Sequence, residues 1–137
     1  MPKLLRDNRV LWTLQILLAV LYLFAGGFKL VASPDAMRAS PSDPIPTPAI
    51  VAFLRVIGGF EVLGALGLVL PGLTGIKRQL TSVAAGCLAV IMAGAVVVTV
   101  MMQGVLPALF PLVVGILDLI VMVGRHERGA QRVSSTV

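Results

Sequence analysis

Four long apolar runs constrain the fold of this chain more than any other feature. They cover residues 10–31, 48–70, 80–102 and 106–124. Each is close to the roughly 20 residues that a helix needs to cross about 30 Å of hydrocarbon. Because backbone in lipid must satisfy its own hydrogen bonds, these runs are predicted to be helices rather than open strands. The sequence therefore predicts an all-α fold, an integral membrane four-helix bundle.

The composition indicates a protein embedded in the lipid bilayer, which is its expected partner. Of 137 residues, 58% are hydrophobic and 12% are charged, whereas a soluble domain carries about 25% charged residues. The formal net charge of +5 is typical of cations on membrane loops. A basic stripe interleaved with polar or aromatic residues is missing, so we expect no nucleic-acid binding.

The positions of the cations predict an orientation. Residues 1–9, the connection 71–79 and the tail 125–137 would share one side of the membrane and carry most of them: Lys3, Arg6, Arg9, Lys77, Arg78, Arg125, Arg128 and Arg132. The positive-inside rule then makes the N-terminus and the tail cytoplasmic, N-in/C-in. The Pro-rich loop 32–48 would face outward, and residues 103–105 would form a tight hairpin. We expect a multi-pass protein of the bacterial cytoplasmic (inner) membrane, with a polar, frayed tail.

Small residues are frequent in the middle runs. Gly58 and Gly64 lie on the second run, and Ala85, Ala89 and Ala93 recur every four residues on the third. Small side chains allow helix backbones to approach closely in lipid. These five positions are predicted to be helix-packing positions.

Four ionisable residues interrupt the apolar runs: Lys29, Arg55, Glu61 and Asp118. At about 1.5 Å per residue, Glu61 and Asp118 lie about 18 and 16 Å from the outer ends of their helices. Arg55 and Glu61 are about 120° apart around one helix, and Arg55 leans away toward the helix N-terminus. We therefore expect Glu61 to meet a partner on another helix, with Asp118 nearest in depth.

These residues allow two interpretations. In the structural one, Lys29 and Arg55 extend to the interface, and Glu61 and Asp118 are protonated acids that bridge helices. In the functional one, they form a polar site in the outer half of the bundle. Lys29 and Arg55 would then attract a small amphipathic or anionic ligand, a quinone among the candidates, while Glu61 with Asp118 exchanges protons.

Motifs for self-contained chemistry are missing. The single histidine, His126, lies in the tail, so we expect neither haem nor a metal site within the membrane. A nucleophile–base pair, a Gly-rich phosphate loop and GxGxxG are all missing. Catalytic residues remain unknown, and the protein is at most a subunit associated with an oxidoreductase.

Three stretches resemble the DoxX-like family of small bacterial membrane proteins. They are AGGFKL (Ala25–Leu30), RVIGGFEVLGALGLVLP (Arg55–Pro71) and AAGCLAVIMAGAV (residues 84–96), and with the four runs the resemblance covers residues 10–124. It implies a four-helix membrane protein. Some members are associated with membrane redox processes, namely quinone-linked oxidation of sulfur compounds or assemblies that handle oxidative stress, so a link to membrane redox processes is expected here.

The resemblance also points to particular residues. By motif match it carries over Lys29, Arg55 and Glu61 as functional positions, and Gly58 and Gly64 as packing positions. Many relatives place a histidine near the end of the third helix, where this chain has VVVTV with Thr99. This departure argues against proton transfer by the third helix.

Two further functions stay open. One is a non-catalytic accessory or scaffold subunit that docks membrane redox or envelope proteins. The other is a small transporter, which would require a homo-oligomer because four short helices leave little room for a pore. Neither a pair of broken helices nor an inverted repeat supports a transporter.

Overall fold

A computed structural model describes residues 2–38, 40–77 and 79–136. This part of the chain is helical and includes no strand. Its elements are η1 (Lys3–Arg6), α1 (Asn8–Val31), α2 (Pro48–Thr74), α3 (Gln79–Gln103) and α4 (Val105–Ser134). The four α-helices are each long and apolar enough to cross a membrane. The all-α membrane fold predicted from the sequence is confirmed.

Local signals set several helix ends. The side chain of Asp7 accepts a hydrogen bond from the backbone N–H of Arg9 at the start of α1, and Thr47 accepts one from Ile50 at the start of α2. Both are the usual N-cap interaction. Between α3 and α4 only Gly104 is non-helical, with φ 96° and ψ −176°. Glycine alone adopts this conformation readily, so the tight hairpin depends on it.

Two helices end later than their hydropathy predicts. The interpretation of residues 125–137 as a frayed tail is wrong up to Ser134, because α4 continues to that residue. Hydropathy misses this extension because it is polar, yet Arg125 ties it to α1 through hydrogen bonds to Asn8 and Gln15. Likewise α2 continues through Pro71, which a membrane helix tolerates where its neighbours compensate.

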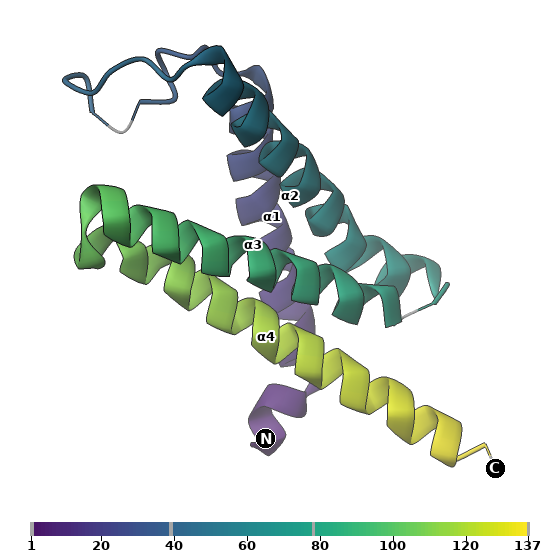
Figure 1. Ribbon diagram of the computed structural model, residues 1–137. Helices are drawn as coiled ribbons and strands as arrows, with labels where there is room; N and C mark the ends of the chain where they lie inside the picture. The colour runs from purple at the N-terminus through teal and green to yellow at the C-terminus, as the bar shows by residue number, and fades with distance from the viewer. Residues whose placement is uncertain (1, 39, 78, 137) are drawn as a thin grey trace.

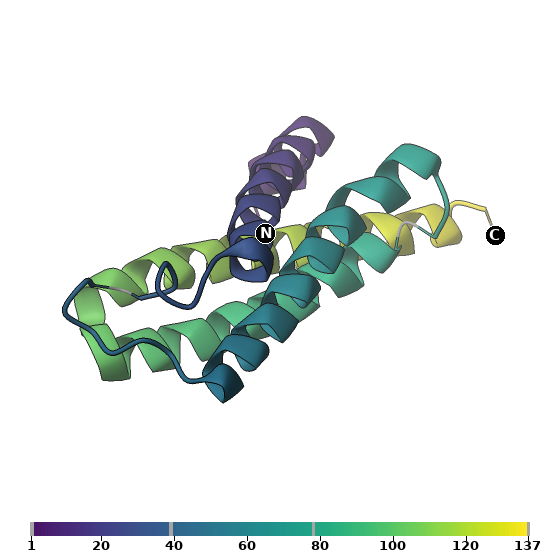
Figure 2. The same ribbon diagram turned by 90° about the horizontal axis from the view of Figure 1, so that it is seen from above.

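The helices form two antiparallel pairs. In Figures 1 and 2, α3 and α4 lie side by side, α2 packs on α1 and on α3, and α1 crosses α4 steeply. Loop 32–47 and the turn between α3 and α4 lie toward one end, here called the loop end (Figure 1). Both termini and the α2–α3 connection lie toward the other, called the terminal end. Arg78, one of the cations behind the predicted orientation, lies outside the described residues.

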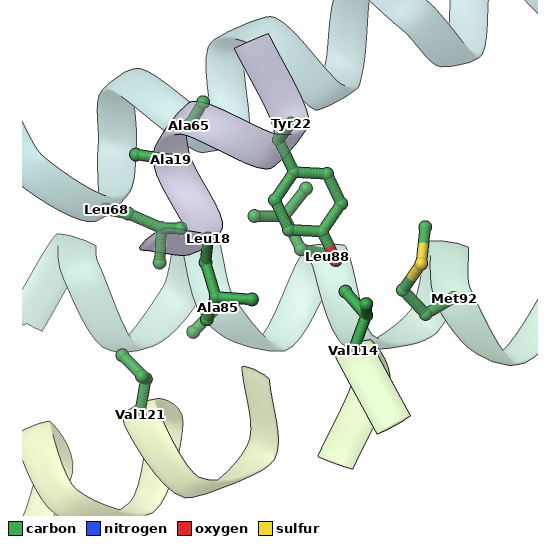
Figure 3. Packing of buried hydrophobic residues seen from close by; sticks show 10 residues of the cluster. All are labelled: Leu18, Ala19, Tyr22, Ala65, Leu68, Ala85, Leu88, Met92, Val114 and Val121. Carbon is green, nitrogen blue, oxygen red and sulfur yellow. The ribbon is translucent and has the colours of Figure 1, made fainter. Parts of the chain in front are cut away.

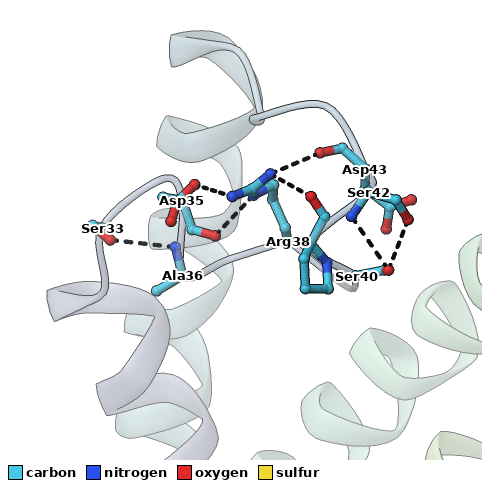
Figure 4. Close-up of polar contacts among 8 residues, drawn as sticks. Ser33, Asp35, Ala36, Arg38, Ser40, Ser42 and Asp43 are labelled. Carbon is cyan, nitrogen blue, oxygen red and sulfur yellow. Dashed lines mark hydrogen bonds and ion pairs between the residues drawn. The ribbon is translucent and has the colours of Figure 1, made fainter.

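Loop 32–47 is organised around Arg38 (Figure 4). Its Nη1 donates to the carbonyl oxygens of Pro41 (2.8 Å) and Asp43 (3.2 Å), and its Nη2 donates to the carboxylate of Asp35. One guanidinium thus joins three points of a segment in which its prolines prevent a regular element.

The core contains side chains from all four helices (Figure 3). Its buried members are Leu18, Ala19, Tyr22, Ala65, Leu68, Ala85, Leu88, Met92, Val114 and Val121. Many other large apolar side chains point outward, among them Phe24, Val90 and Met101, which are 73–81% exposed. So much exposed apolar surface would be a liability in water, but it suits contact with lipid.

The small residues expected to pack behave differently along α3. Ala85 and Ala89 are buried, whereas Ala93 is exposed, so the prediction for Ala93 is wrong for this chain. Each step of four residues turns about 40° beyond a full turn, and two steps rotate Ala93 out of the interface. Met92 takes the buried position instead. On α2, a Cβ at Gly64 would lie 2.6 Å from the Leu88 side chain.

Candidate functional site

Two glycines, Gly26 and Gly58, bring α1 and α2 into close contact. A Cβ built on Gly26 would lie 2.6 Å from the carbonyl oxygen of Gly58, and one on Gly58 would lie 2.8 Å from the carbonyl oxygen of Gly26. Neither position has room for a side chain, so the two backbones are in direct contact. This is the close packing that small residues permit in membranes.

An ion pair lies directly on this crossing. The Nζ of Lys29 donates to both carboxylate oxygens of Glu61, at 2.8 and 2.7 Å. Lys29 follows Gly26 by three residues, and Glu61 follows Gly58 by three. Side chains lean toward the N-terminus of their own helix, so on antiparallel helices these two lean back over the crossing toward each other. The glycine contact therefore positions the ion pair.

The ion pair is shielded unevenly. The side chain of Glu61 is 2% exposed and that of Lys29 is 27% exposed. Glu61 does have its partner on another helix, as predicted, but the partner is Lys29 rather than Asp118. The depth estimate counted only the rise along each helix. It left out the reach of the lysine side chain and the direction in which both side chains lean.

Asp118 has a different partner, which was not predicted. The hydroxyl of Tyr22 donates to Oδ2 of Asp118, and both residues are buried. Figure 3 shows the Tyr22 ring projecting from α1 into the core. Oδ1 of Asp118 is buried and has no hydrogen-bond partner among the described residues. A sequence signal was available, because Tyr22 lies seven residues before Lys29 and so shares its face of α1.

Arg55 stands apart from both pairs. It is exposed on the first half of α2 and lines a groove of about 640 Å³ at the loop end. The rest of the lining is apolar: Pro34, Ile45, Pro46, Pro48, Val51 and Ala52. Arg55 is therefore the only charged group among the described residues that line the groove. The structure thus brings Lys29 and Glu61 together, and places Asp118 and Arg55 at separate points.

Several polar side chains of the described residues lie within the bundle. In residues 2–38, 40–77 and 79–136, no group of three or more His, Cys, Asp and Glu side chains is placed to hold a metal ion. What the bundle holds is a salt bridge, a tyrosine–carboxyl hydrogen bond and a groove with one guanidinium. In general, a guanidinium can donate hydrogen bonds to an anionic group, and a carboxyl group can gain or lose a proton.

The fold and these groups define a multi-pass membrane protein with ionisable side chains inside a four-helix bundle. Its sequence matches the model of the DoxX-like family over residues 13–121. The chain belongs to the DoxX-like family, as the resemblance of its motifs predicted. Comparisons with curated proteins and with solved structures gave no match.

Proposed function

We propose that this protein binds a small amphipathic ligand in the groove at the loop end, with Arg55 contacting the polar head of the ligand. The observation that carries the proposal is the composition of the groove, which combines one guanidinium with apolar walls. Its volume of about 640 Å³ lies in the range of about 300–1,000 Å³ that is usual for small-molecule sites. A carboxylate, a phosphate or a quinone carbonyl would each accept hydrogen bonds from Arg55.

The apolar walls would hold the remainder of the ligand. Val51 and Ala52 on α2 face Ile45 and Pro46 from the loop, so an alkyl or isoprenoid chain could leave the groove toward lipid. Loop 32–47 forms one wall, and Arg38 organises that loop. Ligand affinity therefore depends on the order of the loop as well as on Arg55.

We assign proton exchange to Asp118 rather than to Glu61. Protonating Glu61 would disrupt two charge-assisted hydrogen bonds from Lys29, each worth about 1.5–3 kcal/mol. Asp118 has one oxygen with no partner among the described residues and the Tyr22 hydroxyl on the other. The Lys29–Glu61 pair would hold α1 against α2 between the groove and the Tyr22–Asp118 pair.

The distribution of charge and the family support a proposal for the cellular setting. Cations concentrate at the terminal end, which supports a cytoplasmic location for both termini and an outward-facing groove. We place the protein in the cytoplasmic membrane of a bacterium. There a bound quinone or other amphipathic carrier would link it to membrane redox processes.

Binding of defined probes to the full chain in nanodiscs tests the proposal. Decylubiquinone and decanoate serve as the probes, and dissociation constants are measured by calorimetry. Arg55→Gln should weaken the binding of at least one probe about tenfold or more, a loss of about 1.4 kcal/mol, and Arg55→Lys should weaken it less. Lys77→Gln removes a cation at the terminal end and should leave affinity unchanged.

Two results would contradict the proposal. Equal affinity in the Arg55→Gln variant and the parent would remove Arg55 from the site. Failure of both probes to bind would refute the ligand site and favour an accessory subunit. In that case, purification from native membranes should recover stoichiometric protein partners.

A further inference from the structure

A second pocket lies at the terminal end of the bundle, away from the Arg55 groove. It has a volume of about 260 Å³ and is lined mainly by polar side chains. All four α-helices contribute: α1 near its start, α2 near its end, α3 at its start, and α4 through the polar extension beyond residue 124. The pocket therefore exists because α4 remains helical to Ser134.

Three arginines from α4 face this pocket. Arg125, Arg128 and Arg132 all line it, and their spacing of three and then four residues places them within about 60° on one face of the helix. The neutral polar side chains of Asn8, Gln79 and Thr81 complete the polar part of the wall. The described lining residues include no carboxylate. The pocket thus presents guanidinium and amide N–H donors to one small volume.

The first of these arginines is held in place. Its Nε donates to the Oε1 of Gln15 at 2.6 Å, and its Nη1 donates to Asn8 at 3.0 Å. The guanidinium carbon lies 5.4 Å from the centre of the Trp12 ring, within the range of a cation–π interaction. Gln15 is fully buried and donates to the backbone carbonyl of Leu68 on α2. Arg125 is therefore preorganised by neighbours on α1.

The same tryptophan closes the pocket on the α2 side. A Cβ at Gly72 would lie 2.8 Å from the Trp12 ring, so the ring packs directly against the α2 backbone. Tryptophan is enriched at the level of the lipid head groups. This places the pocket at the boundary between hydrocarbon and water.

We propose that this pocket binds an anionic phosphate group at the membrane surface. The planar donor fork of arginine matches phosphate oxygens in pairs, and basic pockets between membrane helices hold anionic lipid head groups. A volume of about 260 Å³ takes a head-group phosphate but no acyl chains. The phosphate comes from an anionic phospholipid or from a soluble phosphate compound, and the two sources are separated by experiment.

The test uses the delipidated full chain in detergent. In one arm, native mass spectrometry compares binding of phosphatidylglycerol with that of phosphatidylcholine. In the other, the thermal midpoint is measured with and without sodium pyrophosphate. A lipid site predicts about tenfold or greater preference for phosphatidylglycerol, and a soluble-phosphate site predicts a raised midpoint with pyrophosphate.

Variants connect either signal to the pocket. Arg128→Gln combined with Arg132→Gln should abolish the preference or the midpoint shift. Lys3→Gln combined with Lys77→Gln removes the same charge from the same end, outside the lining residues, and should preserve the signal. Arg125 is left intact because it joins α4 to α1.

A further variant distinguishes loss of binding from loss of folding. Gly129 also lines the pocket, and a Cβ there would meet only ordinary contact, 4.0 Å from Gln79. Gly129→Glu therefore introduces a carboxylate into the wall of the pocket without a clash at its Cβ. It should also abolish the signal while helicity is retained. The proposal is overturned if the protein shows neither the lipid preference nor the midpoint shift. It is also overturned if the Lys3→Gln, Lys77→Gln double variant loses that effect as fully as the Arg128→Gln, Arg132→Gln double variant.

Discussion

Replacing Lys29 with methionine should destabilise the protein strongly, because it leaves Glu61 without its partner. Glu61 is 2% exposed and both of its oxygens accept from Lys29, at 2.8 and 2.7 Å. Breaking a buried pair by removing one partner costs about 3–5 kcal/mol, since the remaining charge is uncompensated. Methionine retains most of the apolar stem of lysine, so the loss of stability measures the effect of removing the charge. We therefore expect Lys29→Met to lower the free energy of unfolding by about 3–5 kcal/mol.

The reciprocal change should cost less. Glu61→Gln keeps an acceptor for Lys29, and the 27% exposed Lys29 side chain can turn its charge toward the membrane surface. We expect a loss of about 1–2 kcal/mol, near the net value of a hydrogen bond. Lys29→Met combined with Glu61→Met should recover at least half of the loss, because replacing a buried pair with apolar residues is often neutral.

Unfolding in mixed detergent micelles, followed by circular dichroism as the denaturing detergent is raised, measures these differences. Lys3→Met, a change at an exposed lysine in η1, serves as the control and should stay within about 0.5 kcal/mol. The reasoning is refuted if Lys29→Met costs no more than this control. It is also refuted if the double variant is less stable than Lys29→Met alone, because the cost would then come from packing rather than from a stranded charge.

Three further changes test other contacts. Gly58→Val should separate α1 from α2 and lower the thermal midpoint of unfolding. Gly59→Val is the control and should leave the midpoint unchanged, because a Cβ there has nothing within 4 Å. Equal midpoints for the two variants would contradict the backbone contact. Tyr22→Phe leaves buried Asp118 without its donor and should lower the free energy of unfolding by about 1–3 kcal/mol in the same micelle titration. An unchanged free energy of unfolding would refute the Tyr22–Asp118 hydrogen bond. Arg38→Gln should make loop 32–47 less ordered, and limited proteolysis should then cleave the loop faster. An unchanged cleavage rate would refute the role of Arg38.

The fold could be predicted because length and hydropathy determine it directly. A helix must cross a fixed thickness of hydrocarbon, so four runs of suitable length leave few alternatives. The extension of α4 to Ser134 could not be predicted from hydropathy, because polar side chains stabilise it. Ala93 was misplaced because a four-residue repeat drifts around a helix whose period is 3.6.

The site could be predicted only in part. Lys29, Arg55, Glu61 and Asp118 stand out in an apolar chain, but their pairing depends on side-chain reach and direction rather than on depth. Tyr22 escaped notice because an aromatic residue in a membrane span looks like ordinary core. The spacing that identifies it is visible only when α1 is considered as a whole.

That spacing is a heptad repeat of polar residues on α1. Gln15, Tyr22 and Lys29 are seven residues apart, or about 10.5 Å along the helix, and nearly share one face. Gln15 bonds the Leu68 carbonyl on α2 and accepts from Arg125 on α4. Tyr22 then bonds α4, and Lys29 bonds α2.

This stripe gives α1 a register that apolar packing alone cannot supply. Lipid tails are as apolar as leucine, so burial does not drive helices together within a membrane, and packing and polar contacts set their positions. A slide of α1 by one turn, about 5.4 Å, would break the contacts of all three α1 residues at once and leave Glu61 and Asp118 buried without donors. The two acids Glu61 and Asp118 in α2 and α4 are therefore tolerated because α1 carries a hydrogen-bond donor for each.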